Sequence, residues 1–237
     1  MKTIEVCLTP DLLQHVYFED KIVVVIDIFR ATSCIVTALY HGASSIIPVM
    51  EIEECMAYQQ RGYLGAAERN GFKVDGFDFG NSPLSYVNNP LIKDRTIAMT
   101  TSNGTVAIAK VSTATQVVIG SFLNKTAIIK YLLDQQKDAL LLCAGWKGQV
   151  NLEDSIFAGA VLDDLVRDFK YNNDACGLAR SAYHLSKNNP KRFLTDSAHF
   201  HRLKDQGRMD DIDFCLTTDI YEIVPILEKG EIIRLAV

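Results

Sequence analysis

The chain has 237 residues, of which 48% are hydrophobic and 22% are charged. This composition is typical of globular proteins and excludes collagen, coiled coils and disordered chains. Acidic residues number 29 against 24 basic ones, so the net charge is −5, which argues against a protein that coats nucleic acid or anionic membranes. The chain has no apolar run of the ~20 residues that a membrane span needs and no signal-peptide pattern. We therefore expect a cytoplasmic protein.

Short apolar runs alternate with helical patterns along the chain, and several of these runs are apolar on both faces. The predicted strands cover residues 4–8, 22–26, 45–49, 96–100, 116–121 and 139–144. Buried strands that alternate with helices are typical of a mostly parallel sheet covered by helices on both faces. The sequence therefore predicts an α/β fold.

Three helices have recognisable signals. Thr32 or Ser33 can cap a helix that ends near Gly42, because hydroxyl residues are favoured at N-caps and glycine at C-terminal ends. Residues 156–165 form an apolar stripe opposite acidic residues, which predicts an amphipathic helix that covers the sheet. Another helix is predicted over residues 174–186.

The chain closes with two predicted strands, 222–227 and 230–235, joined by a short turn. Hairpin partners are antiparallel, so the sheet is predicted to be mixed. Pro225 favours an edge strand because proline cannot donate a ladder hydrogen bond. The preceding segment, 197–213, is polar and weakly periodic, and we interpret it as an insertion or lid within one compact domain of residues 1–237.

The six cysteines are widely separated, include no CxxC pair and have mostly apolar neighbours. Cysteines that form disulfide frameworks or zinc sites are spaced in characteristic pairs. We therefore predict that these cysteines are reduced packing residues.

Polar residues cluster where the predicted strands end, which is where parallel sheets bind their ligands. Asp27 and Arg30 follow the strand 22–26. Residues 101–105, Thr-Ser-Asn-Gly-Thr, precede a helix and predict an anion-binding turn. The adjacent carboxylates Glu153 and Asp154 begin the amphipathic helix. Each cluster alone is also typical of capping turns and local ion pairs.

The chemistry of these clusters favours some ligands over others. Hard oxygen ligands without a Cys/His cluster indicate Mg²⁺ rather than zinc. The sequence contains neither a GxxxxGK[ST] P-loop nor a GxGxxG dinucleotide motif. His199 and His201 have no acid or base partner nearby in the sequence, so we interpret them as surface or lid histidines.

Taken together, these motifs resemble the 2-phosphosulfolactate phosphatase family over nearly the whole chain. The matching segments are residues 25–32, 68–69, 76–83, 101–105, 143–145 and 153–154. The resemblance implies a three-layer α/β/α fold. It also implies a Mg²⁺-dependent phosphatase that hydrolyses 2-phospho-3-sulfolactate to 3-sulfolactate and phosphate, a step in coenzyme M biosynthesis.

The resemblance, together with the strand-end clusters, identifies the candidate site residues. The candidate catalytic residues are Asp27, Arg30 and Glu68. The candidate substrate-binding residues are Thr32, Arg69, Asn81, Ser82, Thr101, Ser102, Asn103, Gly104, Thr105 and Gly145. The candidate Mg²⁺ ligands are Asp27, Glu68, Glu153 and Asp154.

Two alternatives remain open from the sequence. A phosphatase of the same fold could act on another small acidic phosphoester, because a fold does not specify the leaving group. A noncatalytic anion-binding module would bind phosphate without releasing it from an ester. In each case the expected partner is a small anionic molecule rather than nucleic acid or a membrane, and a homodimer formed through the final hairpin is a further hypothesis.

Overall fold

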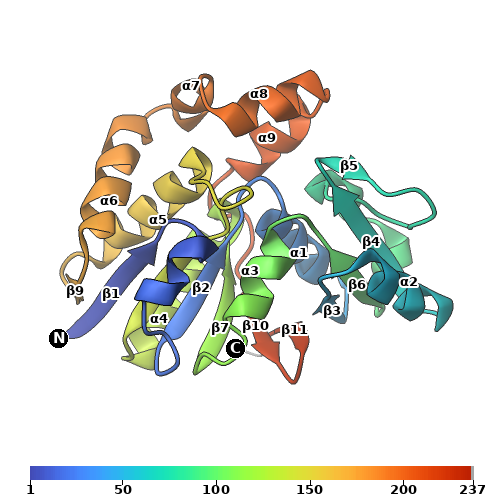
Figure 1. Cartoon of the computed structure of the whole chain (residues 1–237), viewed down its shortest axis with the longest axis horizontal. Coiled ribbons are helices and arrows are strands. Elements are labelled where there is room, and N and C mark those ends of the chain that lie inside the picture. Colours follow the sequence, from blue (N-terminus) through green and yellow to red (C-terminus); the bar gives the residue numbers. More distant parts are fainter. Residues whose placement is uncertain (236–237) are drawn as a thin grey trace.

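A computed structural model describes residues 1–235 as an 11-stranded mixed sheet with helices on both faces (Figure 1). The strands are β1 (Lys2–Cys7), β2 (Ile22–Ile26), β3 (Ser45–Pro48), β4 (Leu64–Arg69), β5 (Phe72–Lys73), β6 (Thr96–Thr100), β7 (Gln116–Gly120), β8 (Ala139–Cys143), β9 (Phe169–Tyr171), β10 (Pro225–Glu228) and β11 (Glu231–Arg234). The α-helices are α1 (Ala31–Tyr40), α2 (Ile52–Gln60), α3 (Gly104–Lys110), α4 (Lys125–Gln135), α5 (Leu152–Leu165), α6 (Asp174–Ser186), α7 (Pro190–Leu194), α8 (Ala198–Asp205) and α9 (Met209–Cys215). Each predicted strand is present, with ends shifted by no more than three residues.

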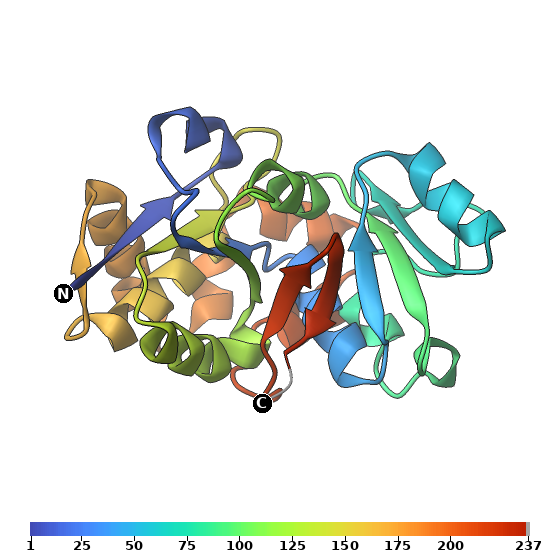
Figure 2. The same cartoon turned by 90° about the horizontal axis from the view of Figure 1, so that it is seen from below.

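The sheet consists of two parallel parts joined by an antiparallel hairpin. Strands β9, β1, β8, β2 and β7 form one parallel part, and β3, β6 and β4 form the other. The hairpin of β10 and β11 lies between them (Figure 2), with β10 paired to β7 and β11 paired to β3. The predicted hairpin and the mixed sheet are therefore confirmed.

The prediction that Pro225 lies at an edge is wrong, because β10 is an interior strand. Proline is tolerated there because Pro225 is the first residue of its strand, a position that proline can occupy without breaking the ladder. The sequence predicted the hairpin from local signals, whereas its insertion between two distant strands depends on the whole fold.

Alternating side chains of the sheet build two buried cores. Val24 and Ile26 contribute to the core shared with α4, α5 and α6, whereas Val23 and Val25 contribute to the core shared with α1 and α3. A third cluster packs α2 against β4 and β6. These layers confirm the predicted α/β/α architecture. All six cysteines are buried and free, which confirms them as packing residues.

Helix α5 differs from the predicted amphipathic helix because it is buried almost all round. Its outer side is covered by α6, and a Cβ added at Gly159 would lie 2.1 Å from the carbonyl oxygen of Ala179. Only glycine allows this close approach of the two helices. The predicted polar face is limited to Asp163 and Asp164 near the end of α5, since residues 167–168 lie beyond it.

The polar segment 197–213, interpreted from the sequence as an insertion or lid, includes helix α8 and most of helix α9. Ser197 caps α8 by accepting a hydrogen bond from the N–H of Phe200 at 3.2 Å. Phe200, Leu203 and Ile212 reach the core from this segment, while the remaining side chains are mostly polar. Among the helices of residues 1–235, none is long and apolar enough to cross a lipid bilayer.

Candidate active site

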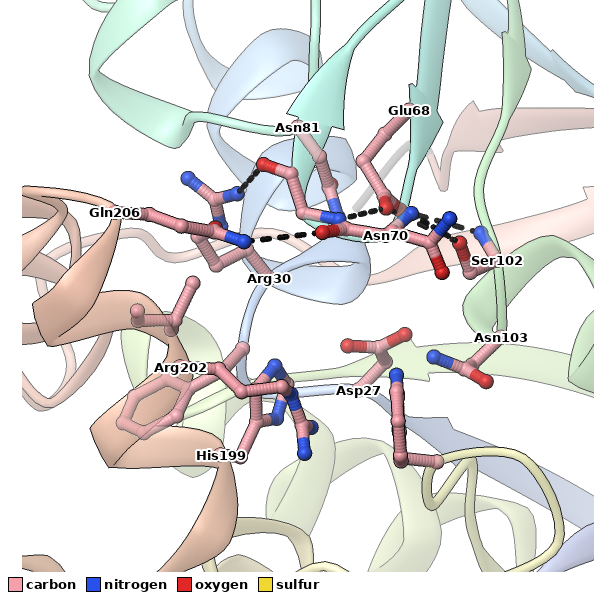
Figure 3. Close-up of a pocket in the computed structure, with 14 residues that line it drawn as sticks. Asp27, Arg30, Glu68, Asn70, Asn81, Ser102, Asn103, His199, Arg202 and Gln206 are labelled. Atoms are coloured by element: carbon pink, nitrogen blue, oxygen red, sulfur yellow. Dashed lines mark hydrogen bonds between the residues drawn. The ribbon is translucent and has the colours of Figure 1, made fainter.

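The carboxyl ends of β2, β4 and β6 face helix α8 across a small cavity (Figure 3). The cavity has a volume of about 90 Å³. It is lined by Asp27, Phe29, Arg30, Glu68, Asn70, Gly71, Asn81, Ser102, Asn103, Trp146, His199, Arg202, Leu203 and Gln206. The structure thus brings together six of the predicted site residues, namely Asp27, Arg30, Glu68, Asn81, Ser102 and Asn103.

Asp27 directly follows β2 and is held by the start of α1. Its Oδ1 accepts a hydrogen bond from the N–H of Ala31 at 3.3 Å, whereas its Oδ2 has no hydrogen-bond partner within residues 1–235. Thr32 fixes the main chain of Asp27, because its N–H and Oγ1 both donate to the Asp27 carbonyl oxygen. One carboxylate oxygen of Asp27 is therefore free for chemistry, while Thr32 has a positioning role.

The surroundings of Asp27 shift the ionisation of its carboxyl toward neutral pH. Burial is the main cause that raises the pKa of Asp27 to about 6. His199 opposes this increase, whereas Glu68 and Glu153 add to it. A carboxyl with such a pKa can accept or release a proton under physiological conditions.

Glu68 lies at the end of β4 and connects two loops of the site. Its carboxylate accepts hydrogen bonds from the N–H of Gly71, from the Ser102 N–H at 3.2 Å and from Ser102 Oγ at 3.1 Å. These hydrogen bonds hold the Glu68 carboxylate in a fixed position beside Ser102 at the cavity.

Arg30 is buried and is neutralised by a residue that the sequence did not identify. Its guanidinium forms an ion pair with Asp211 of α9 and donates to the Gly71 carbonyl oxygen at 3.1 Å. Ser82 Oγ donates to the other oxygen of the same Asp211 carboxylate at 2.5 Å. Arg30 and Ser82 therefore hold α9 against the strand ends, and Ser82 does not line the cavity.

His199 also departs from its interpretation as a surface or lid histidine. Its Nδ1 lies 2.6 Å from Glu153 Oε1, and the His199 side chain lines the cavity near Asp27. Glu153 is fully buried, and its Oε2 has no hydrogen-bond partner among the described residues. The pair can hold the imidazole in one orientation, leaving Nε2 to exchange a proton. The two residues are 46 positions apart, so sequence proximity could not reveal the pair.

Asp154, the neighbour of Glu153, is engaged by the main chain instead. Its Oδ1 accepts from the N–H of Ile28 at 2.9 Å, and its Oδ2 accepts from the N–H of Gly145 at 3.1 Å. Gly145 has a φ of +60°, a conformation in which a side chain is strained. These residues connect the loops after β2 and β8 and do not line the cavity.

The predicted anion-binding turn uses most of its hydroxyl groups internally. Thr101 Oγ1 accepts from the N–H of Thr105, and Thr105 Oγ1 accepts from the N–H of Thr101, both at 3.1 Å. Gly104 allows the turn to approach the aspartate, since a Cβ there would lie 2.8 Å from Asp27 Oδ2. The turn therefore supports Asp27, whereas Ser102 and Asn103 are its residues that line the cavity.

Arg69 points its guanidinium into the structure behind the cavity. It donates to the carbonyl oxygens of Glu68 at 2.8 Å and Met50 at 2.9 Å, and to Thr100 Oγ1 at 2.9 Å. These contacts connect the end of β4 to its neighbours. Arg69 therefore has a structural role behind the cavity and does not line it.

Cys143, which ends β8, is unsuited to nucleophilic chemistry. Its side chain is fully buried, and burial raises the pKa of the thiol well above its ordinary value. Only the thiolate is an effective nucleophile. The oxygen groups around Asp27 are therefore the better candidates for phosphoryl chemistry.

The oxygen atoms at the cavity fit a hard cation such as Mg²⁺. Besides the free Oδ2 of Asp27, the Oδ1 of Asn81 is buried without a hydrogen-bond partner among the described residues. Within residues 1–235, no three or more His, Cys, Asp and Glu side chains form a metal-binding group. Mg²⁺ often takes one or two protein carboxylates and completes its shell with water and substrate oxygens, which matches this donor set.

Comparisons with known proteins agree with this arrangement. The family model described as 2-phosphosulpholactate phosphatase matches residues 7–230. A relative from Caldanaerobacter subterraneus subsp. tengcongensis, named probable 2-phosphosulfolactate phosphatase, is 41% identical over 219 residues, which are 90% of each chain. Relatives with the same name from Thermotoga petrophila and Clostridium tetani are 42% and 34% identical, over 90% and 96% of this chain and 91% and 98% of theirs. These matches place the chain among the phosphatases. The chain belongs to the 2-phosphosulfolactate phosphatase family.

Proposed function

We propose that the chain is a Mg²⁺-dependent phosphatase that hydrolyses 2-phospho-3-sulfolactate to 3-sulfolactate and phosphate. Membership of the family supports the reaction. The observation that carries the proposal is the convergence of Asp27, Glu68 and His199 on one small polar cavity. A substrate that carries a phosphate, a carboxylate and a sulfonate needs both cationic partners and a rigid set of hydrogen-bonding groups.

Asp27 and Glu68 are the proposed protein carboxylates of the Mg²⁺ site, with the amide oxygen of Asn81 as a third donor. When bound, the ion would neutralise charge on the phosphoryl oxygens. Asp154 is left out of this ligand set because it does not line the cavity, whereas Asp27, Glu68 and Asn81 do. Glu153 acts through its contact with His199.

His199 is the proposed proton donor to the leaving oxygen. Water attacks phosphorus, the bond between phosphorus and the ester oxygen breaks, and that oxygen leaves as the hydroxyl of 3-sulfolactate once it receives a proton. The Nδ1 of His199 lies 2.6 Å from Glu153 Oε1, a contact that orients the imidazole and leaves Nε2 to donate. Ser102 and Asn103 line the cavity beside Asp27 and are proposed to bind phosphoryl oxygens.

A phosphate-release assay tests the proposed function. The substrates are 2-phospho-3-sulfolactate, 2-phospholactate and phosphoglycolate, each assayed after chelation and again after Mg²⁺ is restored. We expect the highest kcat/KM for 2-phospho-3-sulfolactate, no turnover after chelation and full recovery with Mg²⁺. A preference for another phosphoester would support the same-fold alternative, and phosphate binding without any ester hydrolysis would support the noncatalytic module.

A further inference from the structure

Two arginines line the cavity, and their surroundings differ. Arg30 is neutralised by Asp211. Arg202, on α8, forms no ion pair within residues 1–235, and its buried Nη2 has no hydrogen-bond partner there. The guanidinium instead lies over the ring of Trp146, with Cζ 3.8 Å from the ring centroid. Arg202 is therefore a positioned cation whose hydrogen-bond donors remain available.

Stacking on Trp146 explains how Arg202 is held but not what it binds. The aromatic face attracts the cation through its π electrons, while the N–H groups at the guanidinium edge are left to other partners. The negative charge of Glu153 opposes the decrease in the pKa of Arg202. The Glu153 carboxylate, however, contacts His199 and forms no ion pair with Arg202. Burial accordingly lowers the pKa of Arg202, as expected for a cation whose desolvation is not compensated by a counterion.

We propose that Arg202, held by Trp146, is the residue that binds the sulfonate of the substrate. This inference rests on the proposed function. In Figure 3 Arg202 lies on the α8 side of the cavity, whereas Asp27 and Asn103 lie on the opposite side. With the phosphate bound at Asp27 and Asn103, the part of the substrate that extends away from phosphorus would face Arg202.

The connectivity of the substrate selects the sulfonate for this role. The carboxylate is bonded to the same carbon that carries the phosphate ester, whereas the sulfonate is separated from that carbon by a methylene group. The sulfonate can therefore extend farther across the cavity. A guanidinium can donate two parallel N–H bonds to such an oxyanion, which makes Arg202 a specificity-determining residue.

A comparison of two substrates shows whether Arg202 contacts the sulfonate or another part of the substrate. 2-Phospholactate carries the phosphate and the carboxylate but lacks the sulfonate. We expect Arg202→Gln to lower kcat/KM for 2-phospho-3-sulfolactate by about 10- to 100-fold, as for a lost charge-assisted hydrogen bond. The same variant should change kcat/KM for 2-phospholactate by less than about 3-fold. Equal losses for the two substrates would overturn the proposal, because Arg202 would then contact a group common to both.

Lys204→Gln is the matched control, since it removes one exposed positive charge from the same helix. It should leave both kcat/KM values unchanged, which separates a direct contact from a general loss of charge. A loss in Lys204→Gln as large as that in Arg202→Gln would overturn the proposal. Arg202→Lys keeps the charge but not the planar donor edge, and we expect it to recover only part of the lost kcat/KM.

Direct binding tests the subsite without turnover. Calorimetry with 3-sulfolactate and with inorganic phosphate should show weaker 3-sulfolactate binding to Arg202→Gln and unchanged phosphate binding. Unchanged 3-sulfolactate binding in a variant with a wild-type melting temperature would overturn the proposal. If wild-type protein failed to hydrolyse 2-phospho-3-sulfolactate, the proposed function would fail, while the difference between the two ligands would still decide whether Arg202 is a sulfonate subsite.

Discussion

Two walls of the cavity differ in charge and in the way their side chains are held. The strand-end wall consists of Asp27, Glu68, Ser102 and Asn103 and is rich in oxygen atoms. Its carboxylates accept hydrogen bonds from nearby main-chain N–H groups. The helical wall consists of side chains from α8 and from Gln206, which directly follows it, chiefly the nitrogen groups of His199, Arg202 and Gln206. One wall suits a cation and phosphoryl oxygens, and the other suits anions and proton transfer.

The contrast also concerns rigidity. Loops that follow buried strands are fixed by the sheet, whereas the helical wall is joined to the strand ends by side-chain contacts. These contacts are Arg30 with Asp211, Glu153 with His199, and Gln206 Nε2 with the carbonyl oxygen of Asn70 at 3.0 Å. Substitutions in the strand-end wall should therefore act mainly on chemistry, whereas those behind the helical wall should also act on stability.

The largest effect on stability is expected for Asp211→Asn. This change leaves the buried guanidinium of Arg30 without its counterion, which should lower the free energy of unfolding by about 3 to 5 kcal/mol. Urea denaturation measures this loss. Asp213→Asn is the control, because it removes a half-exposed carboxylate on the same helix and should cost less than about 1 kcal/mol. Equal effects of the two substitutions would contradict the described role of the Arg30 contact.

His199→Gln should remove proton donation while keeping a polar side chain on the helical wall. We expect kcat to fall by about 30- to 100-fold. The basic limb of the pH profile, where a proton donor loses its proton, should disappear. His201→Gln provides the control, since His201 is exposed on the same helix. A wild-type kcat and pH profile in His199→Gln would show that the contact with Glu153 is only structural.

Asp27→Asn should stabilise the metal-free protein at neutral pH. Because the folded-state pKa of Asp27 is raised to about 6, ionisation destabilises the folded state as the pH rises from about 4 to 6. The variant avoids this cost, so we expect an advantage of about 1 to 2 kcal/mol at pH 7.5 and none near pH 4. Denaturation in chelator at both pH values measures it, and an advantage confined to acidic pH would contradict the assigned environment.

Arg69→Lys should have the smallest effect on catalysis. The structure places the Arg69 guanidinium on main-chain and threonine oxygens behind the strand-end wall. We expect a loss of about 1 kcal/mol in the free energy of unfolding with KM nearly unchanged. A large increase in KM at wild-type stability would instead support the substrate-binding role predicted from the sequence.

The strand-end wall could be predicted from the sequence because its residues follow strands with strong local signals. The stretches before Asp27 and Thr101 are buried strands that end at these polar residues, and the edge of a parallel sheet brings such ends together. What could not be predicted was how each side chain is used. Thr101 and Thr105 bond to each other, and Asp154 bonds to main-chain N–H groups.

The helical wall could not be predicted for a physical reason. Helices α8 and α9 are short, with 8 and 7 residues, so their periodic signals are weak. Their decisive contacts are made with residues far away in the sequence, such as Arg30 with Asp211 across 181 positions. Only the folded chain brings Arg202 over Trp146 and His199 to Glu153.

The most direct test of the account makes the same substitution, aspartate to asparagine, at two buried carboxylates. The two variants are Asp27→Asn and Asp154→Asn. Phosphate release from 2-phospho-3-sulfolactate is measured for both variants and wild-type protein in saturating Mg²⁺. Because Asp27 has a free oxygen in the cavity, its variant should lose about 1,000-fold or more in kcat/KM. Asp154 is bound to the main chain, so its folded variant should stay within about 10-fold of wild type. A folded Asp27→Asn variant with wild-type kcat/KM would contradict the assignment of this cavity as the active site.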